Sequence, residues 1–157
     1  MTEPEQTGLL TCEITLSEPW QCVELEKSSY ADLEQITCPH ETLARLTSLN
    51  EVSAFFRVTR HWLKEKGRYV IEVLDVDSME PKQTYIESEG IACRIYTLED
   101  DRVKVKDRQQ EITLLPLPRN ILGTLVSLYD LSIVSRTLYQ KDVTGPIHII
   151  YHIQKDA

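Results

Sequence analysis

Two arginines, Arg60 and Arg136, each stand alone in a row of apolar residues, and arginines placed in this way can bind anions. Side chains alternate between the faces of a strand, so the row around Arg60 would share one face and consists of Phe56, Val58, Arg60 and Trp62. A half-buried guanidinium needs a partner, and its planar fork suits a carboxylate or a phosphate. The pattern therefore predicts a ligand site at Arg60, Arg136 and Trp62. In the alternative, the arginines reach solvent from a sheet edge or pair with Glu72 or Asp75.

His148 and His152 suggest a metal site, but their spacing argues against one. Four residues along a strand cover about 13 Å, which is too far for one ion to bridge. The alternate positions are apolar and would face the core; they are Ile147, Ile149, Tyr151 and Ile153. Both histidines are therefore predicted on the outer face. The acidic groups at 87–89 and 99–101 lack the order of a calcium loop and are predicted as solvated turns, so no metal ligand is expected.

The turn at Cys38-Pro39-His40 places a thiol near an imidazole in the sequence. A nucleophilic cysteine needs a base within hydrogen-bond reach, and nearness in sequence does not supply that geometry. We expect an ordinary turn here. The chain also lacks a phosphate loop and the G-x-G-x-x-G, G-x-S-x-G and H-E-x-x-H patterns. No catalytic residue and no cofactor are predicted, and a binding protein is expected ahead of an enzyme.

The composition is that of an ordinary globular domain, with 41% apolar and 27% charged residues in 157. We expect a disordered segment over 1–7 and a single domain over 8–157. A net charge of −8 argues against broad nucleic-acid binding, which needs Lys and Arg. No stretch without a formal charge exceeds twelve residues, so no membrane span is expected. Scattered cysteines and no secretory leader predict an intracellular location, cytoplasmic or nuclear.

The elements that must position these residues are short strands and a few helices. The patterns predict a strand over 9–16, helices within 28–50 interrupted at Cys38-Pro39, and a hairpin of strands 51–63 and 68–76. Four further strands are expected between 84 and 117, then a helix over 121–131 and a hairpin of strands 132–140 and 146–154. This order predicts an α+β fold, with a mainly antiparallel sheet and two or three short helices.

The two predicted hairpins and the segments before them have similar sequences, which suggests an internal repeat. SLNEV at 48–52 precedes VTRHWL at 58–63, and SLYDL at 127–131 precedes VSRTLY at 134–139. Two duplicated helix-hairpin halves would follow. Over residues 41–76 and 119–155 the chain resembles the chorismate-lyase-like fold, which includes the UTRA effector-binding domains of bacterial regulators.

The resemblance implies a pocket between the two halves in which Arg60 and Arg136 meet a small anion. Catalytic members need a glutamate in the last strand, and here that strand is IHIIYHI. The leading hypothesis is a non-catalytic binding or adaptor domain for a small anionic ligand or a protein partner. One alternative is a chorismate-lyase-like enzyme acting on a small aromatic acid. Another is an OB-like or Tudor-like barrel that binds protein or single-stranded nucleic acid. An exposed edge strand would also allow a homodimer.

Overall fold

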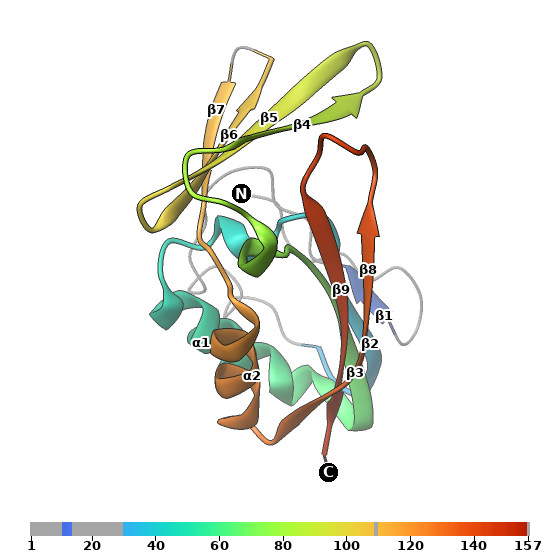
Figure 1. The fold of residues 1–157 in the computed structure, drawn as a ribbon. Coiled ribbons are helices and arrows are strands. Elements are labelled where there is room, and N and C mark those ends of the chain that lie inside the picture. Colours follow the sequence, from blue (N-terminus) through green and yellow to red (C-terminus); the bar gives the residue numbers. More distant parts are fainter. Residues whose placement is uncertain (1–10, 14–29, 109, 157) are drawn as a thin grey trace.

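The computed structural model describes residues 11–13, 30–108 and 110–156, and within them the largest element is a mixed five-stranded sheet (Figure 1). The strand order is β1-β2-β3-β9-β8; β1, β2 and β3 are parallel, and β9 is antiparallel to both of its neighbours. The strands are β1 Thr11–Glu13, β2 Leu33–Cys38, β3 Leu63–Leu74, β8 Leu131–Gln140 and β9 Ile147–Lys155. The segment 1–7, predicted to be disordered, and most of the predicted strand 9–16 lie outside the described residues.

Helix α1 spans Leu49–Thr59, and its start has a clear local cause. Ser48 Oγ accepts a hydrogen bond from the Glu51 backbone N–H (3.3 Å), and Ser-x-x-Glu is a typical sequence at a helix start. The helix buries residues spaced three and four apart, namely Val52, Phe55, Phe56 and Thr59. The predicted strand over 51–63 is therefore wrong. Its alternating apolar residues also fit a helical period, and the cap favours the helix.

Strand β2 corrects a second prediction, because Leu33–Cys38 lies within the segment predicted to be helical. Leu33, Ile36 and Cys38 are buried, and β2 pairs with β1 and β3 on its two sides. The helix α1 connects β2 to the parallel strand β3, as parallel neighbours require. The second predicted helix is reduced to the single turn η2, Leu43–Arg45.

The predicted fold class is wrong as a consequence. The N-terminal half is a strand-helix-strand unit with parallel pairing, and the C-terminal half is the helix α2 (Arg119–Ser127) followed by the antiparallel hairpin β8–β9. The two halves therefore differ in topology and are not duplicates. The predicted hairpins are borne out only in the second half, where the β8–β9 pair matches the expected strands 132–140 and 146–154 within one residue.

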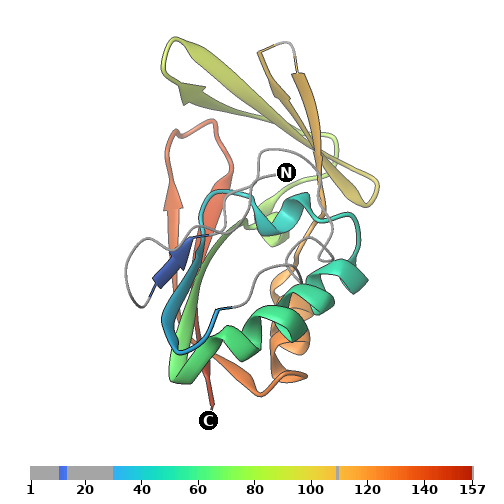
Figure 2. The same cartoon turned by 180° about the vertical axis from the view of Figure 1, so that it is seen from behind.

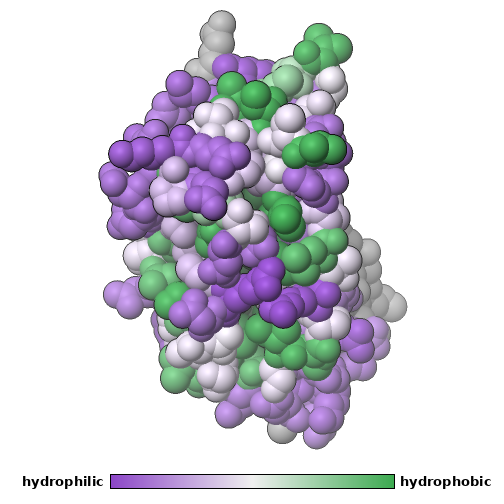
Figure 3. All heavy atoms as spheres, viewed as in Figure 1, coloured by the Kyte–Doolittle hydropathy of each residue, from purple (hydrophilic) through white to green (hydrophobic). Residues whose placement is uncertain are grey.

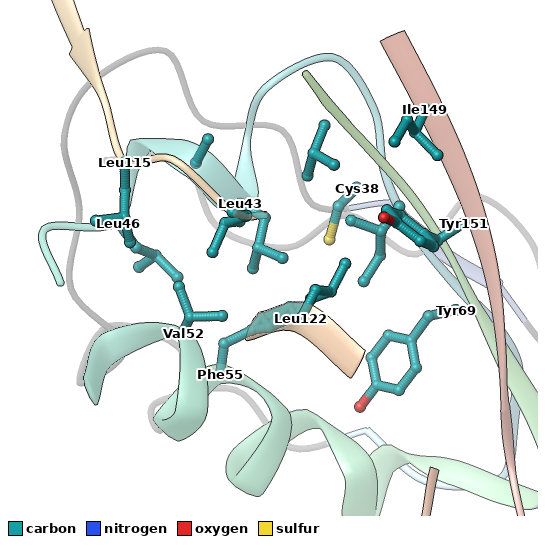
Figure 4. Close-up of a cluster of buried hydrophobic side chains, with 14 of the residues drawn as sticks. Cys38, Leu43, Leu46, Val52, Phe55, Tyr69, Leu115, Leu122, Ile149 and Tyr151 are labelled. Atoms are coloured by element: carbon teal, nitrogen blue, oxygen red, sulfur yellow. The ribbon is translucent and has the colours of Figure 1, made fainter. Parts of the chain in front are cut away.

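The core lies between the five-stranded sheet and the two helices, which are on the same side of it (Figures 1 and 2). α2 spans Arg119–Ser127. Alternate residues of β3 and β9 point into this core, so Tyr69, Ile149 and Tyr151 are almost fully buried. Figure 4 shows them around side chains from α1, α2, η2 and the segment that follows the strand β7, Gln110–Leu114. Thr59 Oγ1 and Tyr69 OH are hydrogen bonded at 2.8 Å, which satisfies the buried phenol.

A four-stranded antiparallel sheet lies beyond the end of β3 (Figures 1 and 2). Its strands are β4 Thr84–Glu89, β5 Ala92–Glu99, β6 Arg102–Asp107 and β7 Gln110–Leu114. They pair in chain order, which confirms the strands predicted between 84 and 117. Two short connections join this sheet to the rest, one through η4 (Val76–Ser78) and one over residues 115–118. Among the described residues, no helix is long and apolar enough to span a membrane.

Candidate active site at the carboxyl ends of the parallel strands

A cavity of about 610 Å³ lies beyond the carboxyl end of β3. Its wall combines the start of α1, the residues that follow β3, the β5–β6 turn and the connection from β7 to α2. Folds built on parallel strands bind their ligands in a crevice at this edge of the sheet. The volume is also within the range of about 300–1,000 Å³ that small-molecule sites occupy. The cavity is therefore the candidate ligand site.

The lining of the cavity is mainly apolar, with acids in its wall. The apolar residues include Leu49, Val76, Leu98, Leu115 and Ile121. Asp100 and Asp101 come from the β5–β6 turn, where Asp100 has a positive φ of 52°. Their carboxylates form no hydrogen bond or ion pair with another described residue. The turn at 99–101, predicted as merely solvated, thus contributes two unpaired charges to a cavity wall.

Both helices begin at this cavity. Ser48 caps α1 and lines the cavity, and Asp77 Oδ2 accepts a hydrogen bond from the Arg119 backbone N–H at the start of α2 (2.9 Å). Arg119 also donates through Nη2 to Asp75 Oδ2 (2.9 Å), and this bond raises the pKa of the guanidinium. Asp75 is only 2% exposed, so the pair fixes the start of α2 against the end of β3.

A second group of polar residues is buried where the two sheets meet. His148 on β9 is only 3% exposed, and its Nε2 is hydrogen bonded to Glu87 Oε2 on β4 at 2.6 Å. Its Nδ1 has no hydrogen-bond partner among the described residues and lies 3.6 Å from Glu72 Oε2. Tyr139 stacks on the imidazole at 4.7 Å and donates its hydroxyl hydrogen to Glu72 (2.8 Å). His148 lies on the face of β9 opposite to the core residues Ile149 and Tyr151, as predicted, but its predicted exposure is wrong, because the second sheet covers that end of β9.

The same group continues on β5 and after β2. Arg94 Nη1 lies 3.3 Å from Glu41 Oε2, and Tyr96 OH lies 3.4 Å from Glu41 Oε1 and 3.3 Å from Glu87 Oε1. Burial acts to lower the pKa of Arg94, but Glu41, Tyr96 and Asp107 together outweigh burial, so the pKa is raised. Burial, reinforced by Glu41, raises the pKa of Tyr96. We call these residues the junction cluster: Glu41, Glu72, Glu87, Arg94, Tyr96, Tyr139 and His148.

The β8–β9 turn also holds the second sheet. Asp142 Oδ2 accepts from the Ser88 backbone N–H (2.6 Å), and the Thr144 carbonyl accepts from the Ile86 N–H (2.8 Å). Gly145 packs so closely that an added Cβ would lie 3.3 Å from Ile86 O. Together with the junction cluster, these bonds hold the second sheet in place, and with it the part of the cavity wall formed by β5, β6 and the turn between them.

The residues predicted to bind an anion lie elsewhere. Arg60 lies in η3 (Arg60–Trp62) at the end of α1, where Nε donates to the Tyr129 carbonyl (2.6 Å) and Nη2 is 3.8 Å from Asp130 Oδ2. Trp62 is buried edge-on against Tyr30 at 5.1 Å. Arg136 is exposed on β8. The structure therefore brings neither arginine to the cavity, and their role in ligand binding remains a prediction.

Sequence reasoning missed both the cavity and the junction cluster. Glu87 and His148 are separated by 61 residues, and Glu41 and Arg94 by 53, so no local pattern connects them. One local signal could have corrected the prediction for residues 51–63. The Ser48-to-Glu51 capping motif indicates a helix start where a strand was predicted. Among the residues that the structure describes, no group of three or more His, Cys, Asp or Glu could hold a metal ion.

Comparisons with known proteins identify the fold. No protein-family model and no curated protein matches the sequence. Among solved structures, an S-adenosylmethionine-dependent methyltransferase from Clostridium acetobutylicum matches with a TM-score of 0.60 at 13% identity, over 83% of this chain and 61% of its own. CalS10, an amino pentose methyltransferase from Micromonospora echinaspora, matches with 0.55 at 14%, over 82% and 60%. The CcbJ methyltransferase from Streptomyces caelestis matches with 0.55 at 15%, over 78% and 61%.

The described fold is thus similar to that of methyltransferases, and the chain spans about three fifths of the length of these proteins. The resemblance to the chorismate-lyase-like fold and UTRA domains is therefore wrong. The interpretation as a non-catalytic binding module, and its lyase and barrel alternatives, are overturned by the same finding. The error traces to residues 33–59, where a strand followed by a helix was taken for a helix followed by a strand.

The names of these proteins imply the cofactor S-adenosylmethionine. The described residues contain no glycine-bearing strand-to-helix turn that would bind it. Glycines at a strand-to-helix turn let the backbone approach a nucleotide cofactor closely. The five glycines of the chain are widely spaced, at positions 8, 67, 90, 123 and 145. None of the four described ones follows the carboxyl end of a parallel strand. We therefore assign no residue of the described part to the cofactor.

Proposed function

We propose that the chain catalyses methyl transfer to a small-molecule acceptor, and that the cavity beyond β3 binds this acceptor. The observation that carries the proposal is the position of the cavity in a methyltransferase-like fold. It lies at the carboxyl end of a parallel strand, where such folds bind their ligands. The apolar wall would exclude water from a bound acceptor, and the starts of α1 and α2 would orient it.

The junction cluster supports this role by making the cavity wall rigid. The β5–β6 turn can hold an acceptor in one orientation only if the four-stranded sheet is fixed to the five-stranded sheet. Glu87 with His148 (2.6 Å) and Glu41 with Arg94 (3.3 Å) supply that attachment from two sides. Catalytic sites need such support, because small displacements of a bound reactant cost large factors in rate.

The proposal is tested by incubating the purified chain with tritium-labelled S-adenosylmethionine and a panel of small amines, alcohols and acids. We expect label to transfer to at least one acceptor. Ile121→Trp, which fills the cavity, should reduce transfer at least about tenfold, because bulk in a binding site excludes the ligand. Leu128→Trp is the control, since Leu128 is 67% exposed and outside the cavity.

Binding of S-adenosylhomocysteine, measured by isothermal titration calorimetry, supplies an independent readout. The proposal fails if no acceptor takes up label and S-adenosylhomocysteine does not bind. It also fails if Ile121→Trp and Leu128→Trp reduce transfer equally, because the cavity would then have no part in the reaction.

A further inference from the structure

The composition of the cavity wall indicates what kind of acceptor it fits. A ligand with an apolar body matches the row of Leu49, Val76, Leu98, Leu115 and Ile121. The charges of the wall are three aspartates, Asp77, Asp100 and Asp101, against one arginine, Arg102. The excess is negative, so an apolar ligand that also carries a positive charge is complementary to both parts of the wall.

The two helix starts are the features that would favour an anion instead, because each presents free N–H groups and the positive end of its dipole. Both are already occupied by side chains of this chain. Ser48 Oγ accepts from Glu51 N in α1, and Asp77 Oδ2 accepts from Arg119 N in α2. A ligand anion would have to compete with these caps and approach the aspartates as well.

Asp100 and Asp101 remain as the carboxylates without a protein partner. The lysine on the neighbouring strand, Lys104, is held by Glu99 (3.4 Å), and neither aspartate is in an ion pair with a described residue. Unlike Asp77, they stabilise no helix start. The net charge of −8 also raises the local concentration of cations around the protein.

Resting on the proposed function, we propose that the cavity selects acceptors that combine an apolar body with a protonated amine, and that Asp100 and Asp101 bind the ammonium group. The ammonium would approach from the β5–β6 turn while the apolar body contacts Leu98 and Ile121. CalS10, one of the proteins with a similar fold, is named as an amino pentose methyltransferase, so the acceptor in its name also carries an amino group.

The test uses three probes that share an indole ring and differ in charge: tryptamine, tryptophol and indole-3-propionate. Binding to the full chain is measured by calorimetry at low salt. We expect tryptamine to bind most tightly and indole-3-propionate least. In the double variant Asp100→Asn with Asp101→Asn, the Kd of tryptamine should rise about fivefold to tenfold and that of tryptophol should stay unchanged. Asparagine accepts the positive φ at position 100, so the turn is preserved.

The matched control is Glu65→Gln with Glu111→Gln, which removes two exposed charges from residues that do not line the cavity. It should leave tryptamine affinity within about twofold of the wild type. Circular dichroism of each variant before titration establishes that the fold is intact.

Three outcomes would overturn the proposal: equal affinity for indole-3-propionate and tryptamine, an unchanged tryptamine affinity in the aspartate variant, or displacement of tryptamine by S-adenosylhomocysteine, which would make this the cofactor's cavity. Failure of the proposed function is recognised separately. In that case tryptamine still binds through Asp100 and Asp101, but no label is transferred to any acceptor.

Discussion

The two interfaces of the five-stranded sheet are built from opposite chemistry. Its helix side is filled with apolar side chains such as Phe55, Leu122 and Ile149, each at most 1% exposed. Its junction with the second sheet is filled with ionisable groups that are also buried, among them Glu41, Glu87 and His148, which are 2%, 6% and 3% exposed. Apolar contacts are non-directional, whereas buried charges are tolerated only with partners at defined distances. The helix side therefore stabilises the fold, and the junction specifies how the second sheet sits on it.

This contrast extends to the surface. On the face drawn in Figure 3, apolar residues form several separate patches among polar ones. The cavity combines both kinds of wall, because it lies where the helix side meets the second sheet. A site in that position can hold an apolar body against the core and a charge against the turn.

The largest expected effect is on the helix side. Phe55 is fully buried between Phe56 and Tyr69, with ring centroids 5.1 and 5.9 Å away. Phe55→Ala should lower the free energy of unfolding by about 3–5 kcal/mol, because it leaves a cavity that the core cannot refill. Urea denaturation measures this, with Leu128→Ala as the exposed control. A loss below about 1 kcal/mol would contradict the view that this core carries the stability.

At the junction, the expected effect is smaller and depends on the partner. Glu41→Gln should cost about 2–3 kcal/mol, because it leaves the buried Arg94 without its nearest counter-charge. Adding Arg94→Met should recover part of this loss, since an apolar side chain needs no partner. The measurement is a double-mutant cycle by urea denaturation. Strictly additive losses would show that the pair acts no differently from two independent core residues.

The smallest effect is a difference in pH dependence between two buried tyrosines. Burial raises the pKa of Tyr69 in the core and of Tyr96 in the junction, the latter with a contribution from Glu41. Above pH 10.0 the unfolded chain loses these phenol protons while the folded chain keeps them, so stability falls as pH rises. Tyr96→Phe should make this fall shallower by up to about 1.4 kcal/mol per pH unit.

Tyr69→Phe should also make the fall with pH shallower, and it should lower stability at neutral pH because the hydrogen bond between Tyr69 and Thr59 is lost. Thermal unfolding between pH 9 and 11.5 compares the two. If Tyr96→Phe keeps the slope of the wild type, Tyr96 ionises freely and the junction is open to solvent.

The sequence predicts the second sheet and the C-terminal hairpin well, because each of their strands pairs with a neighbour in the chain and is bounded by a turn. It fails over residues 33–59, where the same apolar positions fit either period. There Leu33–Cys38 is a strand because it pairs with β1 on one side and β3 on the other. This is tertiary pairing, which the local sequence does not indicate. The junction could not be predicted either, since His148 gains its partner only when the two sheets meet. The acids at 99–101 were recognised as a turn, but not the cavity that they border.

The pairing of β3 with β9 has a consequence for synthesis of the chain on the ribosome. β3 ends at Leu74 and its neighbour begins at Ile147, so all four strands of the second sheet are made in between. That sheet consists of consecutive hairpins and can form from local contacts soon after it emerges. That edge of β3 stays unpaired until β9, Ile147–Lys155, has been made, and its backbone groups are exposed until then. A truncation within β9 would therefore leave a finished second sheet beside an open, aggregation-prone strand.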